Sequence, residues 1–279
     1  MKVIKIAAEM QQIALKHVKA GDEIGLVPTM GALHDGHISL IDKSGKNDDI
    51  TIVSIFVNPT QFGPNEDYLK YPRPIDKDLK ICKKHHVDYV FLPSVAEMFS
   101  DTHKTFVEVS QMQDILCGAF RKGHFRGVAT VVAKLFNISR ADRAYFGLKD
   151  FQQLKIIEKM AKDLNFTTKI VACPTIREKS ALALSSRNSY LNAAQKVNAG
   201  LISQILKEAK ENFKTKPLKT VLGIALKKLK SIPESKIDYA EIVDFYDLSP
   251  ASSKTKKAAF LAAVWVGKTR LIDNMAMNK

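Results

Sequence analysis

The stretch VPTMGALHDGH, residues 27–37, decides the fold of this chain. The apolar run before it, residues 24–27, predicts a buried strand, and residues 38–41 predict the first turns of a helix. Proline and glycine mark a sharp connection between the two elements. His34 and His37 are three residues apart, so they would share one face of that helix. Because a helix start offers unpaired N–H groups to anions, the turn predicts a site for phosphate charge.

A histidine near a helix start is usually a cap or a surface residue, and that interpretation applies to either histidine taken alone. The pattern His34-Asp35-Gly36-His37, directly after Pro-Thr-Met-Gly, favours a catalytic role instead. Gly36 leaves backbone room between the two imidazoles. The pattern resembles the His-x-Gly-His signature of the nucleotidylyl-transferase superfamily, which includes class I aminoacyl-tRNA synthetases. The resemblance implies that the chain binds ATP and promotes attack on its α-phosphate.

The composition bounds the possible partners. The chain has 279 residues, 46% of them hydrophobic, enough for one large or two modest domains. Its formal charge is 43 − 29 = +14, which leaves open a nucleic acid, a membrane surface or an anionic substrate. Nine lysines and three glutamates lie between residues 207 and 236, interleaved with apolar residues at helical spacing. A solvated helix face explains this pattern better than nucleic-acid binding, because no RNA-binding signature accompanies it.

The cysteines and the apolar runs predict a soluble cytoplasmic protein. Cys82, Cys117 and Cys173 are widely spaced and form no Cys-x-x-Cys pair, which suits a reducing compartment. The first residues lack the apolar core of a signal peptide. The longest apolar run, residues 258–266, is too short to span a bilayer.

Strands and helices alternate over residues 1–175, which predicts a Rossmann-like, doubly wound parallel α/β sheet. The predicted strands are residues 24–27, 49–57, 88–92, 105–109 (a short edge strand), 143–146 and 169–173. The predicted helices are residues 6–20, 74–86, 129–138 and 151–164, with residues 117–128 as a basic, glycine-rich loop. In such a sheet, ligands bind beyond the carboxyl ends of the strands, so the loops after the strands would share one edge.

The character of the sequence changes after Pro174. Residues 191–231 predict two helices, and strands are predicted around Val243, at residues 258–266 and at residues 270–273. We therefore predict a domain boundary near residue 175, with residues 176–279 forming a second, smaller α+β domain.

Five separated segments resemble the pantothenate synthetase (pantoate–β-alanine ligase) family, in order and at similar spacing. They are PTMGALHDGH (28–37), SIFVNPTQF (54–62), GHFRGV (123–128), YFGLKDFQQL (145–154) and ALSSRN (183–188), and the closing TRLIDN (269–274) also matches. The resemblance implies that pantoate and ATP give pantoyl adenylate and pyrophosphate, and that β-alanine then displaces AMP to give pantothenate. It further implies Mg²⁺ with the ATP, a homodimer, and a mobile C-terminal lid domain.

The resemblance also assigns roles to individual residues. The expected catalytic residues are His37 as proton donor, with His34, Lys149 and Arg187 stabilising phosphate charge. The expected ATP-binding residues are Met30, Gly31, Ala32, Leu33, His34, Asp35, Gly36, His37, Gly147, Leu148, Lys149, Asp150, Ile176, Leu184, Ser185, Ser186 and Arg187. Gln61 and Gln153 are expected to bind pantoate, because their uncharged amides offer both donors and acceptors to hydroxyls and a carboxylate. Arg121 and His124 are expected near the substrate, and Asp78 is expected to reach Mg²⁺ through water.

The chain departs from the family pattern at a few positions. Leu148 replaces a glutamate, Ser180-Ala181 replaces Asp-Gly, and Leu184 replaces a methionine. The loss of a glycine at residue 181 predicts a stiffer lid loop. Two alternatives stay open from the residues alone: an adenylyltransferase of the same superfamily, and an RNA-binding or tRNA-charging remnant.

Overall fold

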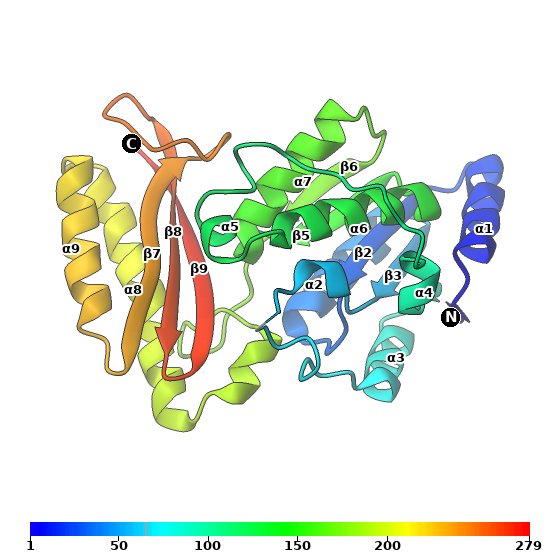
Figure 1. Cartoon of the computed structure of the whole chain (residues 1–279), viewed down its shortest axis with the longest axis horizontal. Helices are drawn as coiled ribbons and strands as arrows, with labels where there is room; N and C mark the ends of the chain where they lie inside the picture. Colours follow the sequence, from blue (N-terminus) through cyan, green and yellow to red (C-terminus); the bar gives the residue numbers. More distant parts are fainter. Residues whose placement is uncertain (65) are drawn as a thin grey trace.

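The larger part of the molecule is a six-stranded parallel sheet covered by helices on both faces (Figure 1). The computed structural model describes residues 1–64 and 66–279. The strands of this sheet are β1 (Lys2–Ile4), β2 (Ile24–Thr29), β3 (Ile50–Ile55), β4 (Tyr89–Phe91), β5 (Arg143–Gly147) and β6 (Lys169–Cys173). Their order is β1-β4-β3-β2-β5-β6, and every pair is parallel. The predicted doubly wound parallel sheet is confirmed.

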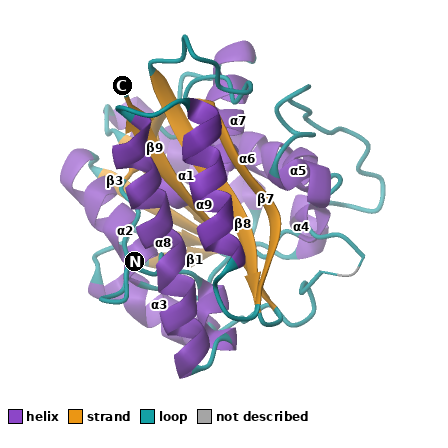
Figure 2. Cartoon of the chain, turned by 90° about the vertical axis from the view of Figure 1, so that its left-hand side faces the viewer, coloured by secondary structure: helices purple, strands orange, loops and turns teal. Residues whose placement is uncertain are grey.

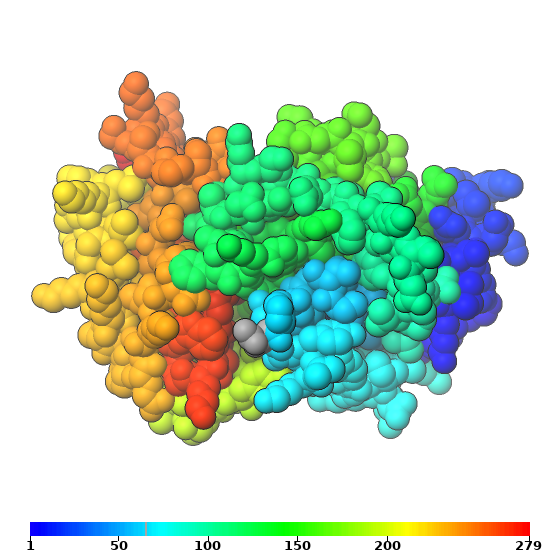
Figure 3. Space-filling view, viewed as in Figure 1, coloured from blue at the N-terminus to red at the C-terminus, as the bar shows by residue number. Residues whose placement is uncertain are grey.

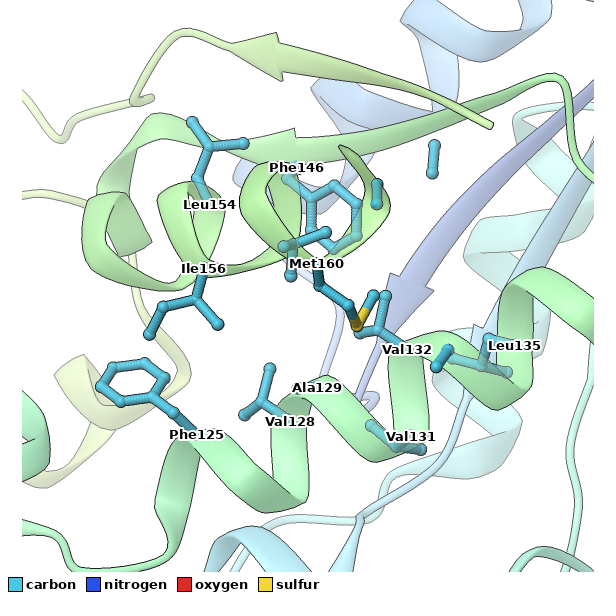
Figure 4. Packing of buried hydrophobic residues seen from close by; sticks show 14 of the residues in the cluster. Phe125, Val128, Ala129, Val131, Val132, Leu135, Phe146, Leu154, Ile156 and Met160 are labelled. Atoms are coloured by element: carbon cyan, nitrogen blue, oxygen red, sulfur yellow. The ribbon is translucent and has the colours of Figure 1, made fainter. Parts of the chain in front are cut away.

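Successive residues of a strand point to opposite faces of the sheet, and here both faces carry apolar side chains that helices bury. Leu26 and Ile52 belong to the cluster that also contains residues of α1 (Ala7–Ala20), α6 (His124–Ser139) and α7 (Phe151–Asp163). Val27 and Val53 belong to the cluster on the other face, under α2 (Asp35–Asn47) and α3 (Ile75–Lys84). Burial on both sides explains why these strands are almost continuously apolar. Figure 4 shows Phe125, Val128 and Val132 of α6 with Phe146 and Met160 in this packing.

The strand order reverses between β2 and β5, which are neighbours at the centre of the sheet. The chain runs from β2 to β3 and β4 on one side, and from β5 to β6 on the other. Loops that follow the two central strands diverge at such a point and leave a crevice for a ligand. The turn with the two histidines follows β2, and the 3-10 turn η2 (Leu148–Asp150) follows β5, so the sheet topology places both at this crevice.

The smaller part is an antiparallel sheet of β7 (Ser235–Asp244), β8 (Lys257–Val266) and β9 (Thr269–Asn278), in the order β7-β8-β9. Helices α8 (Ala193–Phe213) and α9 (Leu218–Lys230) lie over one face, as Figure 2 shows. Phe260 and Val264 pack against these helices. Leu261 and Ala263 point the other way and join the core of the larger part. The predicted α+β character of this part is confirmed.

The two parts lie against each other, as the space-filling view shows where the orange-to-red strands meet the green segment (Figure 3). Short elements complete the chain: α4 (Val95–Met98), α5 (Cys117–Phe120), and the 3-10 turns η1 (Pro59–Gln61) and η3 (Ser186–Tyr190). No helix in the described part of the chain combines the length and apolar character that crossing a bilayer requires.

Three local predictions were wrong. The predicted loop at residues 117–128 begins with a short helix, α5, over Cys117–Phe120. Residues 105–109 form no strand, because their N–H groups turn to side chains: Val107 N–H donates to Thr130 Oγ1 at 2.9 Å. Helix α6 begins at His124, five residues before the predicted start at residue 129. Gly127 explains the third error, since a Cβ there would lie 2.3 Å from the Thr60 carbonyl oxygen. That glycine allows the helix to pack closely against η1 and does not mark a loop.

Candidate active site

Asp78 holds the turn that follows β2. Gly31 and Ala32 have positive φ angles of 81° and 52°. The fully buried Asp78 carboxylate accepts hydrogen bonds from the backbone N–H groups of Ala32 and Leu33, each at 2.8 Å. Because both carboxylate oxygens are engaged and neither reaches solvent, the predicted role of Asp78 at Mg²⁺ does not fit this structure. The residue supports the turn instead.

The two histidines of this turn cap helix α2. His34 Nδ1 accepts a hydrogen bond from Gly36 N–H at 3.1 Å, and His37 Nδ1 accepts one from His34 N–H at 3.3 Å. A ring nitrogen that accepts carries no proton, so each neutral imidazole holds its proton on Nε2. The ring centroids are 4.1 Å apart. A Cβ on residue 36 would lie 2.8 Å from His34 Cε1, which explains the glycine between the histidines.

The surroundings keep both imidazoles neutral. Removal from water, followed by the proximity of His34 and Lys149, lowers the pKa of His37 to about 3. Burial and Lys149 also lower the pKa of His34 below its ordinary value. At neutral pH the pair therefore presents two uncharged Nε2–H donors. This state favours hydrogen bonding to phosphate oxygens by His37 over the expected transfer of a proton from an imidazolium.

The turn η2 after β5 carries the second set of predicted residues. Lys149 Nζ lies 3.3 Å from the Asp150 carboxylate, and the Asp150 side chain is 44% exposed. Gly147, Lys149 and Asp150 line the cavity described below, whereas the Leu148 side chain packs against the hydrophobic core. The glutamate-to-leucine departure at residue 148 therefore falls on a side chain that does not line the cavity.

A segment between the two parts of the molecule closes a third side of the site. Leu184 N–H donates to the Ile176 carbonyl oxygen at 3.0 Å, which folds residues 176–184 back on themselves. Ser185 caps η3 by accepting from Arg187 N–H at 3.3 Å. Tyr71, from the loop after η1, lies 3.3 Å from Ser186 through their hydroxyl groups.

Arg187, which lines the site, forms an ion pair with Asp67, which does not line the cavity described below. Arg187 Nη2 and Nε lie 2.9 Å and 3.2 Å from the two oxygens of Asp67. Burial alone would raise the pKa of the Asp67 carboxyl, but Arg187 outweighs it and lowers that pKa. An anionic substrate that binds Arg187 must therefore share or replace the Asp67 carboxylate.

Gln61 is held on the wall of the site by its neighbours. Asn58, only 1% exposed, donates to Gln61 Oε1 at 3.1 Å, and Gln61 Nε2 donates to Met30 Sδ at 3.0 Å. The Gln61 carbonyl oxygen accepts from His124 Nδ1 at 2.7 Å and from Arg121 Nη2 at 3.3 Å. Arg121 and His124 thus position Gln61 from behind, in addition to lining the cavity.

The adjacent residues Gln152 and Gln153 have different environments. Gln152 is buried; it accepts from Cys117 N–H at 3.0 Å and donates to the carbonyl oxygens of Met112 and Ile115. Gln153 is only partly buried and lines the cavity without such bonds among the described residues. The Gln153 amide therefore has no competing hydrogen bond among the described residues, and its role in pantoate binding stays a prediction.

These groups open into one cavity of about 290 Å³. The predicted residues that line it are Met30, His34, Gly36, His37, Gln61, Arg121, His124, Gly147, Lys149, Asp150, Gln153, Ile176, Leu184, Ser185, Ser186 and Arg187. Five predicted ATP-binding residues do not line it: Gly31, Ala32, Leu33, Asp35 and Leu148. The first three turn their N–H groups to Thr29 and Asp78, and Asp35 is exposed on α2.

Sequence reasoning missed several residues that organise this site. Asp67, Asn58 and Asn274 each contact a predicted residue, and Asp273 pairs with Arg177 beside the lid segment. Asn58 lies in the segment SIFVNPTQF, and its position before Pro59 is typical of a turn cap. Asp273 and Asn274 lie in the matching segment TRLIDN, but that match did not identify their partners. The contacts of Asp67, Asp273 and Asn274 join segments far apart in the chain, so no local pattern signals them. Among the described residues, no cluster of three or more His, Cys, Asp or Glu has metal-binding geometry.

Comparison with known proteins agrees with this geometry. The family model for pantoate-beta-alanine ligase matches residues 2–276. The pantothenate synthetase of Endomicrobium trichonymphae is 71% identical over 279 residues, covering 100% of this chain and 99% of that protein. The corresponding protein of Sulfurihydrogenibium sp. (strain YO3AOP1) is 50% identical over 280 residues, covering 99% of each.

Solved structures resemble the whole chain as well. The pantothenate synthetase of Thermus thermophilus superposes with a TM-score of 0.93 at 38% identity, covering 99% of both chains. The Francisella tularensis pantoate-beta-alanine ligase, complexed with Beta-gamma ATP and Beta-alanine, gives a TM-score of 0.81 at 36% identity, covering 99% of this chain and 97% of that one. These matches extend over nearly the full length of both partners, and this chain therefore belongs to the pantoate-beta-alanine ligase family.

Proposed function

We propose that the cavity holds ATP and pantoate side by side, and that its polar residues promote formation of a pantoyl adenylate. The chain is a carbon–nitrogen ligase of the family, which condenses pantoate with β-alanine at the expense of ATP. The observation that carries the proposal is the convergence of the histidine turn and the Lys149 turn at the strand-order reversal, on one cavity. The roles of individual residues below are part of this proposal.

The wall of the cavity matches the two halves of pantoate. Phe56 and the α6 residues Val128, Val131 and Leu135 line it with apolar surface, which suits the branched aliphatic portion. Gln61 and Gln153 add neutral amides for the hydroxyl and carboxylate groups. A neutral lining leaves the carboxylate unpaired with a cation, so it keeps its nucleophilic character toward phosphorus.

Adenylate formation needs positive potential where pyrophosphate departs. One pantoate carboxylate oxygen bonds to the α-phosphorus, and the bond from that phosphorus to the bridging oxygen breaks, with the electron pair leaving on pyrophosphate. The Nε2–H groups of His34 and His37, the Lys149 ammonium and the Arg187 guanidinium surround this region of the cavity. Donors already oriented toward developing charge lower the barrier because little reorganisation is required. Ser185 and Ser186 add hydroxyl donors.

In the second step the neutral amine of β-alanine attacks the acyl carbon of the adenylate. A carbon–nitrogen bond forms, the bond from that carbon to the AMP oxygen breaks, and the amine releases its proton to solvent. A thioester is not needed. The three cysteines are buried free thiols, and burial raises the pKa of Cys82 to about 12 and also raises that of Cys173.

We propose that Mg²⁺ enters with the triphosphate. Mg²⁺ prefers oxygen ligands and is commonly carried by phosphates with one or two carboxylates. Asp78 does not fit such a role, and the described residues provide no protein cage. When bound, Mg²⁺ would neutralise phosphate charge; the residue roles above do not depend on a protein ligand to it.

The comparisons favour the ligase over both alternatives. The family model that matches residues 2–276 is the one for pantoate-beta-alanine ligase, which supports the ligase over a tRNA-charging remnant. An adenylyltransferase that retains AMP on its product would use the same superfamily motif, but the full-length relatives named above are pantothenate synthetases. We propose a division at residue 175, with residues 176–279 as the lid, and a cytoplasmic location.

We also propose a homodimer, supported by residues 105–109. Within the described residues this segment pairs with no strand, and Phe106 is 38% exposed. The N–H groups of Val107 and Val109 donate to the side chains of Thr130 and Gln113, whereas the Glu108 N–H between them has no acceptor among the described residues and can serve as an open edge. Such an edge can pair with a second copy. Sedimentation of Glu108→Pro, which removes one edge donor, should reveal monomers; an unchanged dimer would exclude this surface.

The experiment that tests the function uses isotope exchange. Pantoate, ATP and Mg²⁺ alone should support exchange of labelled pyrophosphate into ATP. Adding β-alanine should then release AMP and pantothenate in equal amounts, with no ADP. Exchange that strictly requires β-alanine, or the appearance of ADP and phosphate, would contradict the adenylate mechanism.

A further inference from the structure

The middle of β9 touches two of the elements that surround the proposed phosphate site. Asp273 and Asn274 are adjacent on this edge strand of the smaller sheet. Asn274 reaches the η2 turn after β5, and Asp273 reaches the segment that leads to Ser185 and Arg187. Both residues line the cavity, yet neither is among the residues to which the function assigns a role.

Asn274 is bonded to the backbone of η2. Its single amide nitrogen, Nδ2, donates to the carbonyl oxygens of Leu148 at 2.9 Å and of Lys149 at 2.8 Å. Both of its hydrogens are therefore committed. The η2 turn has no side-chain cap of its own, so this amide is its bond to the smaller sheet. Leu148 takes part in this contact only through its backbone carbonyl oxygen. The contact therefore does not depend on the side chain at residue 148, which explains why a leucine is compatible with the turn.

Asp273 makes a second contact of this kind, with the lid segment (residues 176–184). Arg177 Nη1 and Nη2 donate to its two carboxylate oxygens at 2.7 Å and 2.8 Å, and Asp273 is only 7% exposed. Arg177 Nη1 also donates to the Ala181 carbonyl oxygen at 3.1 Å. A bidentate arginine–carboxylate pair fixes orientation as well as distance. The Asp273 carboxylate further accepts from Asn274 N–H at 2.8 Å, which joins the two contacts.

We infer that Asn274 is a positioning residue for Lys149. Asn274 holds the carbonyl oxygens of Leu148 and Lys149, which belong to the two peptide groups that flank the Cα atom of Lys149. It thereby fixes the direction in which the Lys149 side chain leaves the turn. Asp273 does the same for the lid segment through Arg177, so the middle of β9 sets both elements relative to each other. The inference rests on the proposed contact between Lys149 and the phosphates.

The test compares Asn274→Ala with the matched change Asn278→Ala. Asn278 is exposed on the same strand and makes no side-chain hydrogen bond among the described residues. Asn274→Ala should lower kcat for pyrophosphate exchange by about 10-fold or more, because small misplacements of a catalytic group are costly. It should leave the reaction of preformed pantoyl adenylate with β-alanine nearly unchanged. Asn278→Ala should behave as the unmodified protein in both assays.

A double-mutant cycle separates positioning from general structural damage. If Asn274 acts through Lys149, Asn274→Ala should change exchange by less than about twofold in a Lys149→Ala background. Equal effects in both backgrounds, or equal losses in both half-reactions, would overturn the inference. Asn274→Asp, which keeps the size of the side chain but removes both donors, gives the same comparison if the alanine variant folds poorly. Normal exchange in Lys149→Ala alone would instead refute the proposed role of Lys149.

Discussion

The backbone N–H of His34 donates a hydrogen bond to Nδ1 of His37 at 3.3 Å, within the first turn of the same helix. This bond settles the tautomer of His37, because the accepting nitrogen carries no proton. It also ties the His37 imidazole to the helix start, where backbone N–H groups already favour anions. The start of α2, which carries partial positive charge, therefore presents the neutral Nε2–H donors of His34 and His37 in fixed directions.

Replacing His37 tests the donor role directly. His37→Ala should lower pyrophosphate exchange by about 100-fold or more, the scale for removing one group that stabilises developing charge. His37→Gln should retain more activity, because its amide can still donate. The exposed His86 supplies the control, and His86→Ala should exchange normally. Equal activity of the alanine and glutamine variants would argue against hydrogen-bond donation.

Asp78 should matter through the shape of the turn. Asp78→Ala leaves the buried N–H groups of Ala32 and Leu33 without partners, a loss of about 1–3 kcal/mol in the free energy of unfolding. Exchange should fall as well, since the turn no longer holds the histidines. Denaturant titration and exchange kinetics provide the two measurements. Asp76→Ala, an exposed change on the same helix, should cost much less; a Mg²⁺ role would instead appear as a raised Mg²⁺ requirement in the Asp78 variant.

Acid should destabilise the fold through His124. Burial and the nearby Arg121 lower its pKa to about 3, against the ordinary value of 6.5. Between pH 6.5 and about 3 the unfolded chain therefore binds more protons than the folded one. The free energy of unfolding consequently increases with pH over this range and decreases on acidification. The contribution approaches about 1.4 kcal/mol per pH unit.

His124→Asn isolates this contribution. The asparagine amide can replace the Nδ1–H donor to the Gln61 carbonyl oxygen but does not titrate. Unfolding measured at pH 7, 6 and 5 should show a shallower pH slope in this variant. His86→Asn, with an exposed imidazole, should keep the original slope. Parallel curves for His124→Asn and the unmodified protein would contradict the assignment.

Ala181 occupies a left-handed backbone conformation with φ of 69°, where a side chain is strained. Ala181→Gly should relieve this strain and raise the free energy of unfolding by up to about 1 kcal/mol, partly offset by the greater freedom of glycine in the unfolded chain. Ala183→Gly, at a buried position nearby, should lower it. Thermal unfolding distinguishes the two, and a loss of stability in Ala181→Gly would count against the strain.

The lysines of α8 and α9 should be dispensable for catalysis. Lys207, Lys219 and Lys227 are exposed on these two helices, which cover the outer face of the smaller sheet (Figure 2). Replacing all three with glutamine should change kcat/KM for pantothenate synthesis by less than about twofold, because screened surface charges contribute little. Filter-binding at physiological salt should detect no specific RNA affinity. Tight, sequence-selective RNA binding would overturn the interpretation of these lysines as a solvated face.

The spacing of residues in the sequence predicts much of the local structure of this protein. The buried strand, the proline–glycine turn and the paired histidines are neighbours in the chain, so their relations follow from helix and strand periodicity. Gly36 is an example, since the ring of His34, two residues earlier, leaves no room for a Cβ at residue 36. Residues 105–109 mark the limit: their alternation favours a strand, but a strand needs a neighbour that local sequence does not supply.

The sequence by itself therefore determined the class of sheet, the turn at its centre and the residue types gathered there. Tertiary structure alone decided which distant groups support them: Asp78 behind Ala32 and Leu33, Asp67 opposite Arg187, and Asn274 on the backbone of η2. It also decided that His37 is neutral, because its pKa depends on burial and on Lys149 from another strand end. Contacts across 45 to 126 residues arise from the packing of the two sheets and their helices, which no local period encodes.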